Sequence, residues 1–113
     1  MKKNTRWFKN NVYNLYKKDK DVQETAFSNL SLIADSFITE LIEICYKETN
    51  TGVRAWLVEL IAHAKSPDSL DFLSEQFYHP CESIQHWAIR GLQLLNTPQS
   101  RKVLYQLQQN QVL

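Results

Sequence analysis

The sequence is poor in residues that break regular structure and in residues that crosslink small folds. It has only two glycines and three prolines in 113 residues, which argues against many tight turns and favours helices. Its two cysteines, Cys45 and Cys81, do not make a disulfide framework and fit a reduced interior. No apolar run approaches the roughly 20 residues that span a bilayer, and no secretory cleavage signal follows the basic N-terminus. We therefore expect a soluble cytoplasmic protein without a membrane segment.

Acidic residues are missing from the whole C-terminal part of the chain, although the net charge is only +1. Residues 83–113 hold three basic and no acidic side chains, whereas residues 1–20 hold seven basic and one acidic. Residues 21–82 hold three basic and eleven acidic side chains. The sequence thus predicts a molecule with an acidic middle and basic ends, whatever its total charge.

Apolar residues recur at the three- and four-residue spacing of amphipathic helices, and the strict alternation of β-strands is missing. Ser66-Pro67 and Thr97-Pro98 each predict a helix start. The hydroxyl can accept a first-turn N–H, and proline at the first position lacks only a donor that would have no partner. The pattern predicts an all-α fold of about seven short helices.

The chain repeats itself with a shift of 31 residues. Residues 53–73 align without a gap on residues 84–104, so that Trp56 matches Trp87 and both proline starts coincide. A weaker copy at 22–42 has neither the tryptophan nor the proline. A fixed period of paired helices is typical of an α-solenoid, in which each pair buries its apolar face against its neighbours. Both tryptophans are therefore interpreted as packing residues between helix pairs.

The repeat resembles the HEAT repeat, in the short bacterial form of phycobilin-lyase-type HEAT-like proteins. The likeness rests on V-R-x-x-(L/A)-x-x-x-(I/L) from Val53-Arg54, followed by a short loop with proline and a second helix. In the next copy the Val-Arg pair becomes Ile84-Gln85. The resemblance implies a short right-handed solenoid of antiparallel helix pairs in one domain, residues 1–113. Its parts are a capping helix in 1–20 and helix-pair repeats in 22–47, 53–78 and 84–110.

No motif in the chain predicts catalysis, a metal or a cofactor. His79, Cys81 and His86 lie close in sequence, but a zinc or nucleophilic site would need a further ligand or an orienting acid. The two glycines are isolated, which excludes a glycine-rich loop that cradles phosphates. His63, near the end of its helix, is interpreted as structural. We expect a protein that is not an enzyme.

Acidic side chains are predicted to share one face of successive second helices. Asp68, Asp71 and Glu75 are spaced i, i+3 and i+7, and Glu40 aligns with Asp71 one repeat earlier. In solenoids the second helices line the concave, binding surface, where a row of carboxylates would attract a basic partner. Tyrosines near the ends of these helices are candidate anchors. The alternative is that these carboxylates are simply the ordinary solvent-exposed side chains of amphipathic helices. The predicted partner-binding residues are Glu40, Glu43, Tyr46, Asp68, Asp71, Glu75 and Tyr78.

Short HEAT-like chains with an acidic groove resemble the immunity proteins encoded beside contact-dependent and other polymorphic toxins. This resemblance implies a protein-binding module that neutralises a cognate cytoplasmic toxin, expected to be a basic nuclease. One alternative is a generic HEAT-like scaffold or adaptor. Another is a solenoid that binds nucleic acid through its basic N-terminal helix, although the acidic remainder of the surface argues against a long duplex. That helix interleaves Lys2, Lys3, Arg6, Lys9, Lys17, Lys18 and Lys20 with Trp7, Tyr13 and Tyr16.

Overall fold

The computed structural model describes residues 4–111. Within that range the chain forms seven α-helices and two short 3₁₀ helices, η1 and η2, and no strand. The all-α fold predicted from the sequence is confirmed. The elements are α1 (Thr5–Asn14), α2 (Lys20–Ile33), η1 (Ala34–Ser36), α3 (Ile38–Lys47), α4 (Thr51–Ala64), η2 (Pro67–Ser69), α5 (Leu70–Gln76), α6 (Glu82–Leu95) and α7 (Pro98–Gln111).

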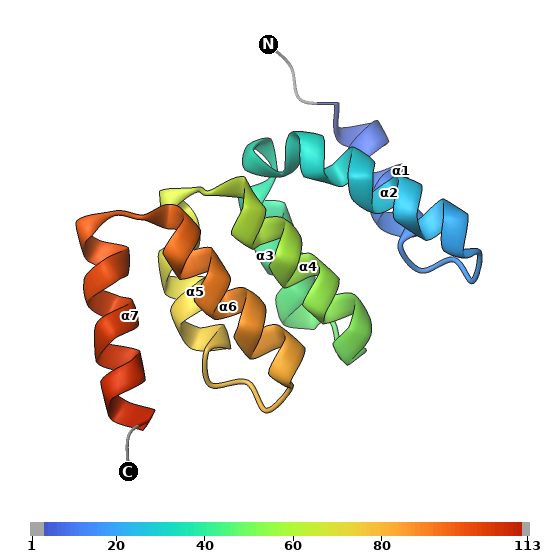
Figure 1. Cartoon of the computed structure of the whole chain (residues 1–113). Coiled ribbons are helices and arrows are strands. Elements are labelled where there is room, and N and C mark those ends of the chain that lie inside the picture. The colour runs from blue at the N-terminus through green and yellow to red at the C-terminus, as the bar shows by residue number, and fades with distance from the viewer. Residues whose placement is uncertain (1–3, 112–113) are drawn as a thin grey trace.

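The helices stack as pairs into a short solenoid that measures 44 × 33 × 21 Å. Helices α2, α4 and α6 form one layer, which faces the viewer in Figure 1, and α3 and α5 lie behind it. Helix α1 packs on α2 at one end, while α7 packs on α6 and α5 at the other. The most extensive helix contact joins α4 to α6. This arrangement is the solenoid of helix pairs that the 31-residue repeat predicts.

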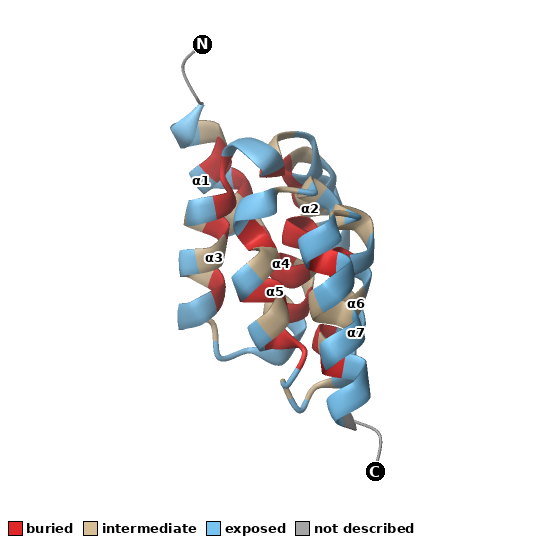
Figure 2. Cartoon of the chain, turned by 90° about the vertical axis from the view of Figure 1, so that its left-hand side faces the viewer, coloured by how far each residue is buried: buried red, intermediate tan, exposed pale blue. Residues whose placement is uncertain are grey.

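The apolar core runs between the two layers along the molecule, as the buried residues in Figure 2 show. We call α2, α4 and α6 the first helices of the pairs, and α3 and α5 the second helices. The core contains Leu30, Leu57 and Leu92 from the first helices and Leu41 and Leu73 from the second helices, and all five are fully buried. Each such leucine contributes about 1.5–3 kcal/mol to stability by leaving water. Because one helix pair cannot bury its apolar face alone, each pair is held by its neighbours.

Two of the first helices end in the same unusual backbone conformation. Lys65 follows α4 with φ 55° and Asn96 follows α6 with φ 48°, both in the left-handed region. This conformation terminates a helix because it turns the chain away from the helix axis. The matching residue of the weaker copy, Ala34, keeps a right-handed φ of −57°, so the chain continues from α2 into η1. The first pair is therefore joined differently from the other two.

The predicted proline starts are confirmed, and a buried serine completes each of them. The Ser66 hydroxyl accepts the Asp68 N–H at 3.3 Å, and the Thr97 hydroxyl accepts the Ser100 N–H at 3.0 Å. In return the Ser69 hydroxyl donates to the Ser66 carbonyl at 2.7 Å, and that of Ser100 donates to the Thr97 carbonyl at 3.0 Å. Ser69 and Ser100 are fully buried. The serines are tolerated in the core because their hydroxyls are hydrogen-bonded.

Gly91 lets α6 lie unusually close to the preceding pair. A Cβ at this position would lie 2.8 Å from Leu73 Cδ1 and 3.0 Å from Ala62 Cβ. The matching residue one repeat earlier is Leu60, which is fully buried. A position with no room for a Cβ in α6 thus holds a leucine in α4, so the α2/α4 and α4/α6 junctions cannot have the same spacing.

Candidate protein-binding site

The predicted binding residues lie on α3, on α5 and on the short segments beside α5. Helix α3 and the η2–α5 segment are neighbours, and α3 and α5 appear side by side in Figure 2. Together these segments carry five acidic residues and one basic residue, Lys47. Asp68 belongs to η2 and not to α5, because the helix begins with a 3₁₀ turn. We call these residues the acidic second-helix face: Glu40, Glu43, Tyr46, Asp68, Asp71, Glu75 and Tyr78.

The side chains of the acidic second-helix face are mostly accessible. Glu43, Asp68 and Asp71 are exposed, and Glu40 is half-buried. The ring of Tyr78 is 60% exposed although its edge packs on Phe77. The face therefore offers carboxylates to solvent on two neighbouring helices, and its aromatic groups remain within reach of a partner.

One contact ties the two helices of this face together. The Tyr46 hydroxyl donates to both carboxylate oxygens of Glu75, at 3.0 and 2.9 Å. The Tyr46 ring meets Phe72 edge-on, with 5.3 Å between the ring centroids. Burial, followed by the hydrogen bond and the charge of Glu75, raises the pKa of Tyr46, so the hydroxyl stays a donor. Tyr46 and Glu75 are thus held in place, and Glu43, Asp68 and Asp71 remain for long-range attraction.

The residues that could suggest metal or thiol chemistry are engaged in local structure. His79 Nδ1 accepts the backbone N–H of Cys81 at 3.0 Å, and burial, followed by the charge of Arg54, lowers the pKa of His79. The ring of His86 packs edge-on against Trp87, with centroids 5.0 Å apart. Within residues 4–111 no three His, Cys, Asp or Glu side chains come together as metal ligands. In the same range no helix has the length and apolar character of a membrane span.

The basic N-terminal residues only partly fit a nucleic-acid surface. Lys17 Nζ lies 4.4 Å from the centroid of the Tyr13 ring and covers one of its faces. The Tyr16 hydroxyl donates to a carboxylate oxygen of Glu48, so this tyrosine is directed to an acid. Arg6, Lys9, Lys17, Lys18 and Lys20 are exposed, and Lys2 and Lys3 lie outside the described residues.

Comparison with known protein families identifies the architecture. Residues 38–112 match HEAT repeats, a stretch that runs from the start of α3 through α7 and covers more than half of the chain. The chain belongs to the HEAT repeat family. HEAT repeats form helical scaffolds that typically mediate protein–protein interaction. No curated protein and no solved structure matches the chain.

Arg54 has a structural role in the HEAT repeats of this chain that residue spacing in the sequence does not predict. Arg54 Nη1 donates to the carbonyls of Cys45 at 3.0 Å and of Glu48 at 3.2 Å, at the end of α3. Its Nε and Nη2 donate to Gln76 Oε1 at 3.3 and 3.1 Å, and Gln76 is buried at the end of α5. The guanidinium thus caps α3 and links it to α5 behind the acidic second-helix face. In the sequence, the feature that could have indicated this role is the arginine of the Val53-Arg54 pair in the repeat motif.

Proposed function

We propose that this HEAT repeat chain is a scaffold that binds a basic protein partner through the acidic second-helix face. The observation that carries the proposal is charge: α3 and the neighbouring η2–α5 segment carry five carboxylates and a single lysine. Such a one-signed surface speeds encounter with an oppositely charged protein. The Tyr46–Glu75 contact supports it further, because side chains already held in place lose less entropy on binding.

Charge reversal tests this proposal. Glu43→Lys with Asp71→Lys should slow association with the partner about tenfold at low salt, and added salt should narrow the difference. The control reverses two exposed acids outside the face, Asp35→Lys with Glu82→Lys, which changes the net charge equally. Stopped-flow mixing with the isolated partner gives the rates. Equal rates for both double variants would contradict a role for the face.

The more specific hypothesis is that the partner is a toxin, in particular a basic nuclease, and that the chain is its immunity protein. Its support is the resemblance of short HEAT-like chains with an acidic groove to immunity proteins, and the hypothesis uses the same face. Co-expression with the product of the adjacent gene should protect cells from that product, and the Asp71→Lys variant should protect less. An adjacent gene product that is harmless alone would remove the immunity hypothesis and leave the scaffold proposal standing.

A further inference from the structure

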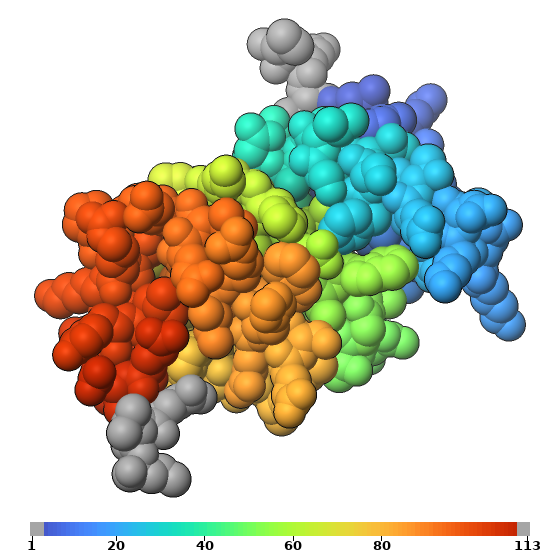
Figure 3. All heavy atoms as spheres, viewed as in Figure 1, coloured from blue at the N-terminus to red at the C-terminus, as the bar shows by residue number. Residues whose placement is uncertain are grey.

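A second surface lies on the opposite layer, between α2 and α4. A cavity of about 390 Å³ opens there, lined by Glu24, Phe27 and Ser28 from α2 and by Trp56 and Glu59 from α4. In Figure 3 it lies where the cyan surface of α2 meets the green surface of α4. An adjoining cavity of about 330 Å³ also contacts Trp56. Its other lining residues are Gln23, Asn50, Gly52 and Val53. We call the two cavities together the Trp56 groove.

The residues that line the groove differ from the matching residues of the next junction. In the next junction, between α4 and α6, the residues that match Glu24 and Phe27 are Ala55 and Val58, and both are buried. The matching tryptophan, Trp87, packs against the ring of His63 at 5.2 Å, where α6 lies close to α4. The α2/α4 junction thus presents a carboxylate and an aromatic ring, Glu24 and Phe27, where the α4/α6 junction has two buried aliphatic side chains.

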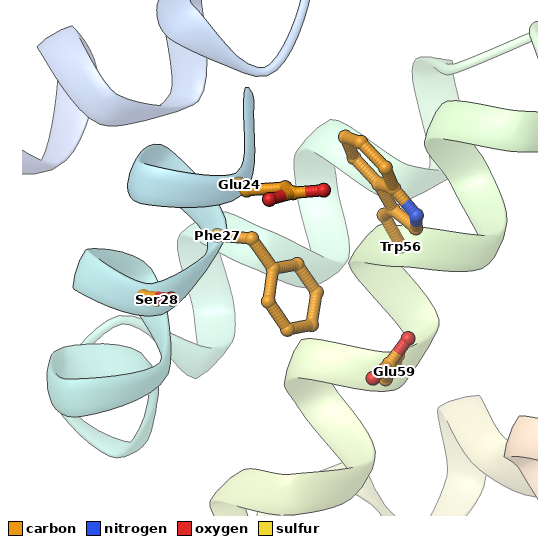
Figure 4. Close-up of a pocket in the computed structure, with 5 residues that line it drawn as sticks. All are labelled: Glu24, Phe27, Ser28, Trp56 and Glu59. Atoms are coloured by element: carbon orange, nitrogen blue, oxygen red, sulfur yellow. The ribbon is translucent and has the colours of Figure 1, made fainter. Parts of the chain in front are cut away.

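The groove combines two carboxylates with aromatic rings. In Figure 4 the Glu24 carboxylate extends from α2 toward Trp56, and Glu59 lies one turn further along α4. The Phe27 ring stands edge-on to the indole, with centroids 6.1 Å apart. Within residues 4–111 Glu24 has no ion-pair or hydrogen-bond partner, whereas the Glu59 carboxylate lies 3.9 Å from His63 Nε2 and is also close enough to His86 to feel its charge. Two carboxylates beside an indole face are complementary to a flat organic cation.

We propose that the Trp56 groove binds an arginine side chain from an extended segment of a partner protein. The guanidinium lies against the indole face and donates to the two carboxylates, while the neighbouring cavity takes the backbone on either side. A guanidinium fits better than an ammonium because it both stacks on an aromatic ring and donates to carboxylates as a planar fork. Partial burial raises the pKa of Glu59 because its carboxylate is less well hydrated than in water. A bound cation would restore part of that stabilisation, and the attraction between the two charges is stronger in a partly buried site.

Peptide titration followed by two-dimensional NMR tests the groove with the native chain. The probes are short capped peptides with one central residue, which is arginine, lysine or the uncharged arginine analogue citrulline. The arginine peptide should shift the indole N–H resonance of Trp56, the lysine peptide should bind more weakly, and the citrulline peptide should leave the resonance in place. Equal shifts with citrulline, or free arginine binding as tightly as the arginine peptide, would overturn the proposal.

Two double variants separate binding in this groove from unspecific attraction to an acidic surface. Glu24→Gln with Glu59→Gln should weaken the arginine peptide about tenfold, with an unchanged circular dichroism spectrum. Asp35→Asn with Glu82→Gln removes the same charge from exposed positions outside both surfaces and should leave peptide affinity unchanged. Equal weakening by both variants would show unspecific attraction and refute the groove. Because the groove does not depend on the acidic second-helix face, either site can fail without the other.

Discussion

Replacing Arg54 by methionine removes the link between α3 and α5 but keeps most of the aliphatic volume. Four hydrogen bonds of 3.0–3.3 Å are lost, and the buried side-chain carbonyl of Gln76 loses its donor. A hydrogen bond to a charged group contributes about 1.5–3 kcal/mol, and an unsatisfied buried group costs about 1–3 kcal/mol. The four bonds share one guanidinium, so their contributions do not add. We expect the free energy of unfolding to fall by about 2–4 kcal/mol.

Urea unfolding followed by far-ultraviolet circular dichroism measures this loss. At about 4 °C per kcal/mol for a domain of this size, the melting temperature should fall by about 8–16 °C. Gln85→Met is the matched control, because Gln85 occupies the position of Arg54 in the next repeat, and it should cost less than about 1 kcal/mol. Arg54→Lys keeps the charge without the planar fork and should lie between the two. If Arg54→Met were no more damaging than Gln85→Met, the linking role of the guanidinium would be refuted.

Three further outcomes follow from the packing and from the shifted pKa values. Gly91→Ala should lower the free energy of unfolding by up to about 2 kcal/mol, because overpacking costs about 1–3 kcal/mol and alanine regains roughly 1 kcal/mol of this in a helix. A more stable variant in urea titration would contradict the close helix approach. Burial raises the pKa of the Cys45 thiol to about 12, so iodoacetamide should label the half-buried Cys81 first, as mass spectrometry can show. Equal labelling rates in the folded chain would be inconsistent with this. Burial and then Glu48 raise the pKa of Tyr16 from 10.0 to about 12. The folded state therefore keeps a proton that the unfolded state loses, and stability should fall as the pH rises from 10 to 12. Urea titrations at several pH values should show a weaker fall in Tyr16→Phe, and an identical pH dependence would exclude this contribution.

Much of the fold could be predicted because its signals are local or periodic. The proline starts after Ser66 and Thr97 depend on side chains within a few residues, so the sequence alone predicts them. The 31-residue shift likewise predicts the solenoid without any knowledge of contacts. The spacing between helix pairs could not be predicted in this way. It depends on what Gly91 meets across the junction, and the approach of α6 to Ala62 and Leu73 appears only when the helices are assembled.

The candidate site shows the same division. Helical spacing predicts that Asp71 and Glu75 share a helix, and the structure places them in α5 next to α3. Helical spacing does not predict the hydrogen bonds of Tyr46 with Glu75, 29 residues apart, because such pairs depend on how two helices are placed relative to each other. The Trp56 groove is missed for a related reason. Trp56 and Trp87 are equivalent in sequence, and the different neighbours that surround them at the two junctions appear only when the helices are assembled.

The two connections that contain a buried serine, Ser69 or Ser100, suggest how such a chain can gain further repeats. Each of these connections is called a joint below. The left-handed helix end, the hydroxyl cap and the buried serine all fall within residues 65–69, and again within residues 96–100. Neither joint borrows a side chain from another repeat for these hydrogen bonds. A tandem copy of residues 66–96 would therefore bring a complete connection between two helices with it. The hydroxyl and backbone groups of that connection would keep their hydrogen-bond partners. Such a copy also carries Gly91, which sets the distance to the preceding pair, so the turn alone does not fix the spacing of the stack.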